Sequence, residues 1–194
     1  MFNDYVDFDM DSVINADSSY EMKRQNFLND VIQHEGGYVN KAVDRGGETK
    51  FGISKKQYPN LDIKNLSQMQ AMMIYNNDFL NNSEANYGKN PIALKMADVQ
   101  INTGKSTLIM QQSLNALALQ HNLPINGGML DEDGKMGNKT RMAYKLIRNK
   151  VGDKALMDKI VDKQKNYYLS IVDSDSTQEV FLDGWMNRAD YRPE

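Results

Sequence analysis

The sequence predicts a mainly α-helical fold, an α+β arrangement with one small β-hairpin beside the first helix. Apolar residues recur at helical spacing over most of the chain, which is typical of amphipathic helices that pack around a core. Only residues 49–53 alternate in the manner of a strand. No repeat, linker or low-complexity run interrupts residues 20–190, so they are expected to form one globule.

The expected helices are marked by their boundary residues. The first begins at a capping box, with Ser18 at the N-cap and Glu21 three residues later. Pro91 suits the first position of another helix, and Gly104 suits the residue after its end. Ser67 and Asn138 are expected to cap two other helices. The expected helices cover residues 18–35, 67–79, 91–103, 106–119, 138–149 and 152–172, followed by a short closing segment at 181–191.

The charge distribution separates an N-terminal extension from the rest of the chain. Residues 1–18 contain five of the 26 acidic residues and no Lys or Arg. The remainder therefore carries 23 basic and 21 acidic residues and is nearly neutral, which does not suit nucleic acid as a main partner. We expect an acidic extension at 1–18, a first lobe at 19–90 and a helical second lobe at 91–194, with the two lobes packed together.

The residue inventory excludes several kinds of site. The chain has no Cys and only two His, His34 and His121, so it offers no disulfide, no thiol nucleophile and no His-rich metal site, and we expect no cofactor. His34 and Glu35 do not begin a zinc-protease motif, because HExxH requires a second His where this chain has Tyr38. No apolar run approaches the roughly 20 residues of a membrane span. The N-terminus lacks the basic and apolar segments expected of a signal peptide.

Residues 34–54, HEGGYVNKAVDRGGETKFGIS, concentrate the candidate chemistry of the chain. Glu35 ends a helical pattern at the edge of its apolar face, where partial desolvation would raise its pKa as a general acid requires. Two glycines then break the helix, and Asp44 follows nine positions after Glu35. Two such carboxylates suit glycoside hydrolysis, in which an acid protonates the leaving oxygen and a second group acts on the opposite face of the sugar.

This stretch resembles the signature of glycoside hydrolase family 108, HEGGYVNDPxDPGGETKYGIS, found in the N-acetylmuramidases of phage endolysins and bacterial cell-wall enzymes. The two match without gaps, and the departures in this chain are Lys41, Ala42, Arg45 and Phe51. The segments that resemble the second half of the family, a peptidoglycan-binding type of region, are 98–104, 114–117, 133–140 and 181–188. The resemblance implies a lysozyme-like fold over roughly residues 26–188, in which the first lobe is catalytic.

The resemblance further implies hydrolysis of the β-1,4 bond between N-acetylmuramic acid and N-acetylglucosamine in peptidoglycan. Glu35 is then the expected general acid, Asp44 activates water or stabilises the oxocarbenium-like transition state, and Thr49 positions that water. The spacing of these three residues resembles that of T-even phage lysozymes, with the Thr one residue nearer. Glu48 is an alternative to Asp44 as the second catalytic group. Successive side chains of a strand point to opposite faces, so at most one of Glu48 and Thr49 faces the substrate directly. The expected substrate contacts are Tyr38 and Tyr58 along the sugar groove and Gln100 and Asn102 at acetamido groups.

Three other hypotheses remain open from the sequence. An enzyme of another specificity, such as a chitinase, would differ only in its substrate. A non-catalytic wall-binding module would have no need of Glu35. A virion-associated or secreted effector muramidase would use the acidic extension for delivery.

The expected partner is the peptidoglycan glycan strand, with a holin, virion or secretion apparatus for delivery and an immunity protein left open. We expect a monomer, made in the host cytoplasm without a signal peptide and active on the cell wall or in the periplasm.

Overall fold

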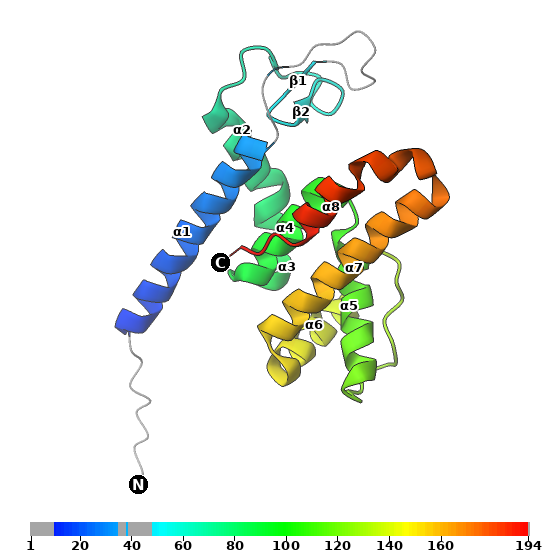
Figure 1. Cartoon of the computed structure of the whole chain (residues 1–194). Helices are drawn as coiled ribbons and strands as arrows, with labels where there is room; N and C mark the ends of the chain where they lie inside the picture. The colour runs from blue at the N-terminus through cyan, green and yellow to red at the C-terminus, as the bar shows by residue number, and fades with distance from the viewer. Residues whose placement is uncertain (1–9, 35–37, 39–47, 194) are drawn as a thin grey trace. The chain divides into compact units, whose positions relative to one another are not determined.

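The computed structural model describes residues 10–34, 38 and 48–193. The chain divides into two compact units, residues 1–75 and residues 76–194. The described residues are mainly helical, and the one sheet among them has two antiparallel strands (Figure 1). The predicted fold class, mainly α with a small hairpin, is confirmed. None of the helices that these residues form is long and apolar enough to cross a membrane.

The first unit contains a long helix, α1 (Met10–His34), which packs against α2 (Gln68–Tyr75). The buried residues near its C-terminal end are Phe27, Leu28, Val31 and Ile32. The start of α1 differs from the prediction, because Ser18 lies inside the helix instead of at its N-cap. Residues 10–17 contain neither Gly nor Pro, so no residue there prevents the helix from extending beyond the capping box.

The start of α2 follows the predicted cap at Ser67. The Ser67 hydroxyl accepts a hydrogen bond from the Gln70 backbone N–H at 3.2 Å. In return, the Gln70 side-chain oxygen accepts one from the Ser67 backbone N–H at 2.9 Å. This reciprocal capping box satisfies two N–H groups that have no partner within the helix. The predicted helix at 67–79 continues without a break beyond Tyr75, but residues 76–80 form a π-helix, η1 (Asn76–Leu80), instead of further α-helical turns.

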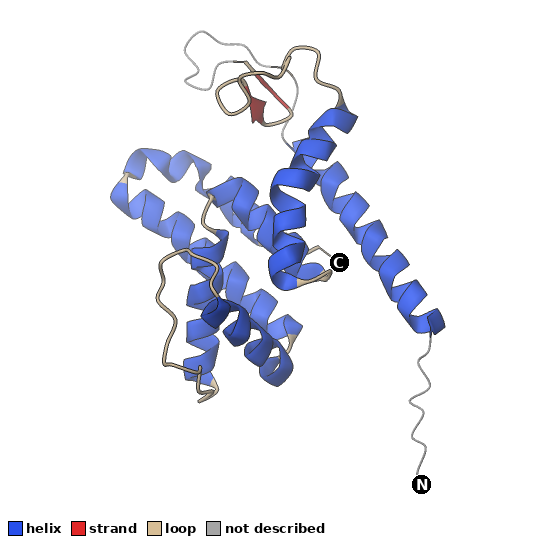
Figure 2. Cartoon of the chain, turned by 180° about the vertical axis from the view of Figure 1, so that it is seen from behind, coloured by secondary structure: helices blue, strands red, loops and turns tan. Residues whose placement is uncertain are grey.

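The predicted strand at residues 49–53 is a complete hairpin. In it, β1 (Thr49–Lys50) pairs with β2 (Ile53–Ser54), so that Thr49 lies opposite Ser54 (Figure 2). The two turn residues, Phe51 and Gly52, have φ of 50° and 73°. A two-residue turn with positive φ at both positions matches the twist of the strands. Gly52 adopts a positive φ freely, but Phe51 has a side chain that disfavours it. The turn at Phe51 is held by a hydrogen bond from the Tyr75 hydroxyl to the Phe51 backbone carbonyl at 2.9 Å.

The second unit is helical, and its α4 (Pro91–Thr103) has both predicted ends. Asn90 caps it, since the Asn90 side-chain oxygen accepts hydrogen bonds from the N–H groups of Ile92 and Ala93. Gly104 follows the helix in the left-handed conformation, with φ of 64°. The other elements are η1 (Asn76–Leu80), α3 (Asn81–Tyr87), α5 (Ser106–Gln120), α6 (Asn138–Val151), α7 (Asp153–Ser174), η2 (Ser176–Phe181) and α8 (Leu182–Ala189). The predicted cap of α6 is wrong by one residue, because Gly137 occupies the N-cap and Asn138 is already helical.

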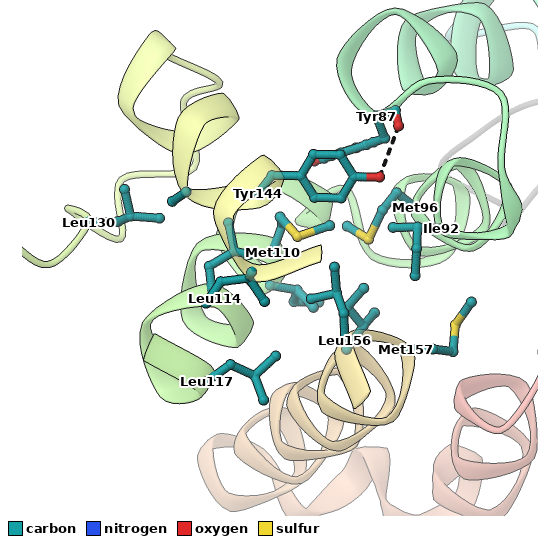
Figure 3. Close-up of a cluster of buried hydrophobic side chains, with 14 of the residues drawn as sticks. Tyr87, Ile92, Met96, Met110, Leu114, Leu117, Leu130, Tyr144, Leu156 and Met157 are labelled. Carbon is teal, nitrogen blue, oxygen red and sulfur yellow. Dashed lines mark hydrogen bonds between the residues drawn. The ribbon is translucent and has the colours of Figure 1, made fainter. Parts of the chain in front are cut away.

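The core of the second unit lies where α4, α5, α6 and α7 meet (Figure 3). Four of its members, Met96, Met110, Leu114 and Leu156, are at most 1% exposed. Protein cores are close-packed, so these side chains determine how the four helices pack together. The core therefore holds α4 and the start of α5 in fixed positions.

A buried ionic cluster attaches the C-terminal segment to α4. The Lys95 ammonium, with a side chain 0% exposed, donates hydrogen bonds to the backbone carbonyls of Ala189 at 2.8 Å and Tyr191 at 2.9 Å. Asp98 is also fully buried and pairs closely with Arg188, while Lys95 lies 3.8 Å away. Burial lowers the pKa of Lys95 to about 8 and raises the pKa of Asp98, because a dry environment disfavours each charged form.

Candidate active site

The two ends of the predicted catalytic stretch are anchored in the first unit. Helix α1 ends at His34, one residue before Glu35, and β1 begins at Thr49. Buried side chains fix the last turns of α1, as described above. Glu35 and Asp44 lie outside the described residues, so their assignment as acid and second catalytic group stays a prediction.

Glu48 is held directly before the hairpin by a tyrosine from the same stretch. The Tyr38 hydroxyl donates a hydrogen bond to the Glu48 carboxylate at 3.0 Å. The Glu48 backbone carbonyl accepts another from the Lys55 N–H at 2.8 Å, which closes the base of the hairpin. A carboxylate oriented in this way has one oxygen engaged by the phenol, while Tyr38 as a whole remains 39% exposed. Sequence reasoning named both residues but did not predict their contact.

Thr49 is carried on a hairpin that several contacts immobilise. The Lys50 ammonium donates to the backbone carbonyl of Lys64 at 3.1 Å. The Lys55 ammonium donates to the carbonyl of Leu61 at 2.8 Å. Ile53 on β2 is 2% exposed. A site needs rigid support to hold a reacting group or a water within a fraction of an ångström. The hairpin provides such support for Thr49, whose proposed water-positioning role stays a prediction.

Tyr58 lies in the turn that follows β2 and is partly buried. Its backbone N–H donates to the Ser54 carbonyl at 2.9 Å, and its carbonyl accepts from the Leu61 N–H at 3.1 Å. The turn therefore continues directly from the hairpin. The structure gives Tyr58 a defined backbone position, and its place along a sugar groove stays a prediction.

Gln100 and Asn102 belong to α4 in the second unit. The Gln100 side-chain oxygen accepts hydrogen bonds from the Ser106 hydroxyl at 2.6 Å and from the Ser106 N–H at 3.3 Å, so it joins α4 to the start of α5. The Asn102 amide donates to the backbone and side chain of Asp98 at 2.8 and 3.1 Å. Both side chains thus have structural contacts, and their predicted contacts with acetamido groups remain to be tested.

A pocket of about 250 Å³ that sequence reasoning missed lies in the second unit, and Gln100 forms part of its wall. Tyr87, the last residue of α3, is buried and also lines this pocket. The available signal was the two asparagine pairs at residues 76–77 and 81–82, which sequence reasoning interprets as the fraying end of a helix. The structure instead continues there as η1 and α3, and two asparagines of α3, Asn82 and Asn86, line the pocket.

The acidic loop at 131–133 has a structural explanation. The Asp133 carboxylate accepts hydrogen bonds from the Gln111 amide and from the Lys135 N–H, both at 2.9 Å. Asn115 holds the preceding loop through both the N–H and the carbonyl of Leu130. Within the part of the chain that the structure describes, no group of three or more His, Cys, Asp or Glu is arranged to hold a metal ion.

Comparisons with known proteins give one similar fold and two family regions, and the boundary between these regions, at residues 104–108, lies inside the second unit. The solved structure of Brucella abortus SagA is similar over 89% of this chain and 90% of its own, with a TM-score of 0.60 and 20% sequence identity, which shows a shared fold. None of the curated proteins matches significantly in sequence. Residues 28–104 match the family model described as glycosyl hydrolase 108, and residues 108–190 match the predicted peptidoglycan domain. The first region therefore belongs to glycosyl hydrolase family 108 and the second to the peptidoglycan domain family, and the chain is a glycoside hydrolase that acts on peptidoglycan.

Proposed function

We propose that this protein is an N-acetylmuramidase that cleaves the β-1,4 bond between N-acetylmuramic acid and N-acetylglucosamine. The observation that carries the proposal is that the whole HEGGYVNKAVDRGGETKFGIS stretch lies inside residues 28–104, the region that matches the hydrolase family. The adjoining peptidoglycan domain at 108–190 supports a wall polymer as the substrate.

In the proposed mechanism, Glu35 donates a proton to the leaving glycosidic oxygen. Asp44 acts on the opposite face of the sugar, where it activates water or stabilises the oxocarbenium-like transition state. Thr49, at the start of the rigid hairpin, positions the water. The Glu48 contact with Tyr38 supports this division of roles, because the phenol already occupies one oxygen of the Glu48 carboxylate.

The cleaved bond is the direct test of this function. Purified peptidoglycan is digested, the products are reduced with borohydride, and the reducing ends are identified by mass spectrometry. A muramidase produces reduced N-acetylmuramic acid ends. Reduced N-acetylglucosamine ends would instead show a glucosaminidase, and free stem peptides would show an amidase. Chitin oligomers digested in parallel separate a muramidase from an enzyme of chitinase specificity, and faster cleavage of chitin would contradict the proposal.

The stereochemistry of the product is a further prediction from the proposed roles. We expect inversion at the anomeric carbon, because a Thr beside the second carboxylate is useful when a water must be oriented between the two catalytic groups. Inverting enzymes separate their carboxylates by about 6.5–9.5 Å, whereas retaining enzymes place them about 5–5.5 Å apart. NMR of a soluble wall fragment, recorded before mutarotation, identifies the first anomer. A retained product would make Asp44 a nucleophile and would remove the water-positioning role of Thr49.

A further inference from the structure

The tip of the hairpin formed by β1 and β2 contains a residue in a conformation that its side chain disfavours. Phe51 has φ of 50°, in the left-handed region that bulky residues rarely adopt. The hairpin requires this conformation, because turns with negative φ at this position would splay the two strands. A strained backbone persists only where the surrounding structure holds it in place. A contact from outside the turn is therefore needed to hold Phe51.

Tyr75 supplies this contact from α2. Its hydroxyl donates a hydrogen bond to the Phe51 backbone carbonyl at 2.9 Å, which fixes the peptide plane between Phe51 and Gly52. Tyr75 is the last residue of α2 and is only 4% exposed. The packing of α2, and not the hairpin itself, therefore determines where the hydroxyl lies.

The other side-chain contacts of the hairpin are of a different kind. The Lys50 ammonium donates to the Lys64 carbonyl and the Lys55 ammonium to the Leu61 carbonyl, and both hydrogen bonds are exposed to solvent. They join the ends of the strands to the segment after β2 through long side chains that lose much rotamer freedom when they are held. The hydrogen bond from Tyr75 is partly buried and reaches the turn directly.

Helix α2 also supports the other end of the predicted catalytic stretch. It packs against α1, whose last residue, His34, directly precedes Glu35 in the sequence (Figure 1). Through Tyr75 the same helix holds the hairpin that begins at Thr49. A shift of the hairpin on α2 would change the distance between these two ends, and a misplacement of about 1 Å can lower a reaction rate by about 10²-fold.

We propose that Tyr75 is a positioning residue of the hydrolase, whose hydroxyl holds the Phe51 carbonyl, keeps the turn in its strained form and so places Thr49 for the reaction. The role of Thr49 rests on the proposed function, whereas the hold on the hairpin does not. Tyr75 acts in this scheme through the hairpin and not through a contact with the substrate.

Hydrogen exchange measures the hold on the hairpin. The Lys55 N–H is the reporter, because it donates to the Glu48 carbonyl across the base of the hairpin at 2.8 Å. We expect Tyr75→Phe to speed the exchange of this N–H about tenfold, since the hairpin opens more easily without the hydrogen bond. The N–H groups in the middle of α5 are expected to exchange as in the parent chain, which would show that the effect is local.

Phe51→Asn tests whether the hold on the turn is what the reaction requires. Asn followed by Gly is a preferred pair for a two-residue turn with positive φ at both positions, so this variant keeps the turn without help from Tyr75. Turbidity clearing of purified walls measures the rate for Tyr75→Phe, with and without Phe51→Asn. We expect Tyr75→Phe to lower the rate at least about tenfold in the parent chain. In the chain that carries Phe51→Asn, we expect a loss below about threefold.

Tyr144→Phe is the matched control. Tyr144 is also 4% exposed, and its hydroxyl also donates to a backbone carbonyl, that of Tyr87, at 2.9 Å (Figure 3). This bond lies in the second unit, so the variant loses the same kind of contact without touching the hairpin. It is expected to lower the midpoint of urea unfolding and to leave the exchange of the Lys55 N–H unchanged. Phe51→Asn is expected to leave its rate of wall clearing unaffected.

The results decide the role of Tyr75 separately from the cleaved bond. Unchanged exchange at Lys55, unchanged wall clearing, or an equal loss of rate with and without Phe51→Asn would each overturn the positioning role. Faster exchange, together with a loss of rate that Phe51→Asn removes, would support it. The reducing ends in the digests identify the cleaved bond, so a bond other than that of a muramidase would contradict the proposed function while the result for Tyr75 stands.

Discussion

Replacing Glu35 with Gln is expected to lower hydrolysis of purified peptidoglycan by about 10²–10⁴-fold while the protein remains folded. The amide has nearly the same shape as the carboxylic acid but has no acidic proton to donate to the leaving oxygen. Turbidity clearing of purified walls measures the rate, and thermal unfolding followed by circular dichroism confirms that the variant is folded. A folded Glu35→Gln protein with most of its activity would remove Glu35 from the mechanism.

Glu48→Gln is the matched comparison for this experiment. It makes the same chemical change thirteen residues later in the same motif, at a carboxylate that accepts a hydrogen bond from Tyr38. A Gln side chain retains an oxygen for that bond, so we expect a loss of less than about tenfold. If Glu48→Gln instead loses as much activity as Glu35→Gln, Glu48 holds the second catalytic role in place of Asp44.

Replacing Lys95 with Met is expected to lower the free energy of unfolding by about 3–5 kcal/mol. The variant keeps the apolar stem of the side chain but removes both hydrogen bonds to the carbonyls of Ala189 and Tyr191. It also leaves the buried Asp98 with one cationic neighbour, Arg188, where it had two. Urea unfolding measures the loss, and a change below about 1 kcal/mol would show that the cluster contributes little.

Lys165→Met is the matched control for Lys95. Lys165 also contacts the C-terminal segment, through an ion pair with Asp190 at 2.7 Å, but the two side chains are 32% and 56% exposed. Exposed pairs of this kind contribute about 0.2–1 kcal/mol, because water screens the charges. The contrast between the two lysines therefore separates the effect of burial from the effect of losing a positive charge.

The pH dependence of the free energy of unfolding gives a second test of the burial of Lys95. In the unfolded chain its amine keeps a proton until about pH 10.5, whereas in the folded protein it loses the proton near pH 8. Between these values the unfolded state binds more protons, so the free energy of unfolding rises with pH. The wild type should therefore gain stability relative to Lys95→Met between pH 8 and pH 10.5. A constant difference would contradict a lowered pKa at Lys95.

Local signals in the sequence were sufficient where a boundary depends on backbone chemistry. Pro91 has no N–H to leave unsatisfied at a helix start, and Gly104 adopts the left-handed conformation at a helix end, so both ends of α4 were predicted. The cap at Ser67 was predicted for a similar reason. Near the N-terminus, the predicted cap at Ser18 was wrong, because the residues before it can also be helical and α1 begins at Met10.

The sequence by itself determined the helical class, the family of each region, and the residue types available to the chemistry, because these depend on periodicity and on contiguous motifs. The contact between Tyr38 and Glu48 was decided by the tertiary structure. The tertiary structure alone also buries Lys95, a residue type that is almost always exposed, and brings its ammonium to the backbone carbonyls of Ala189 and Tyr191. These features depend on which side chains meet across turns and between helices, and local spacing along the chain carries no information about such contacts.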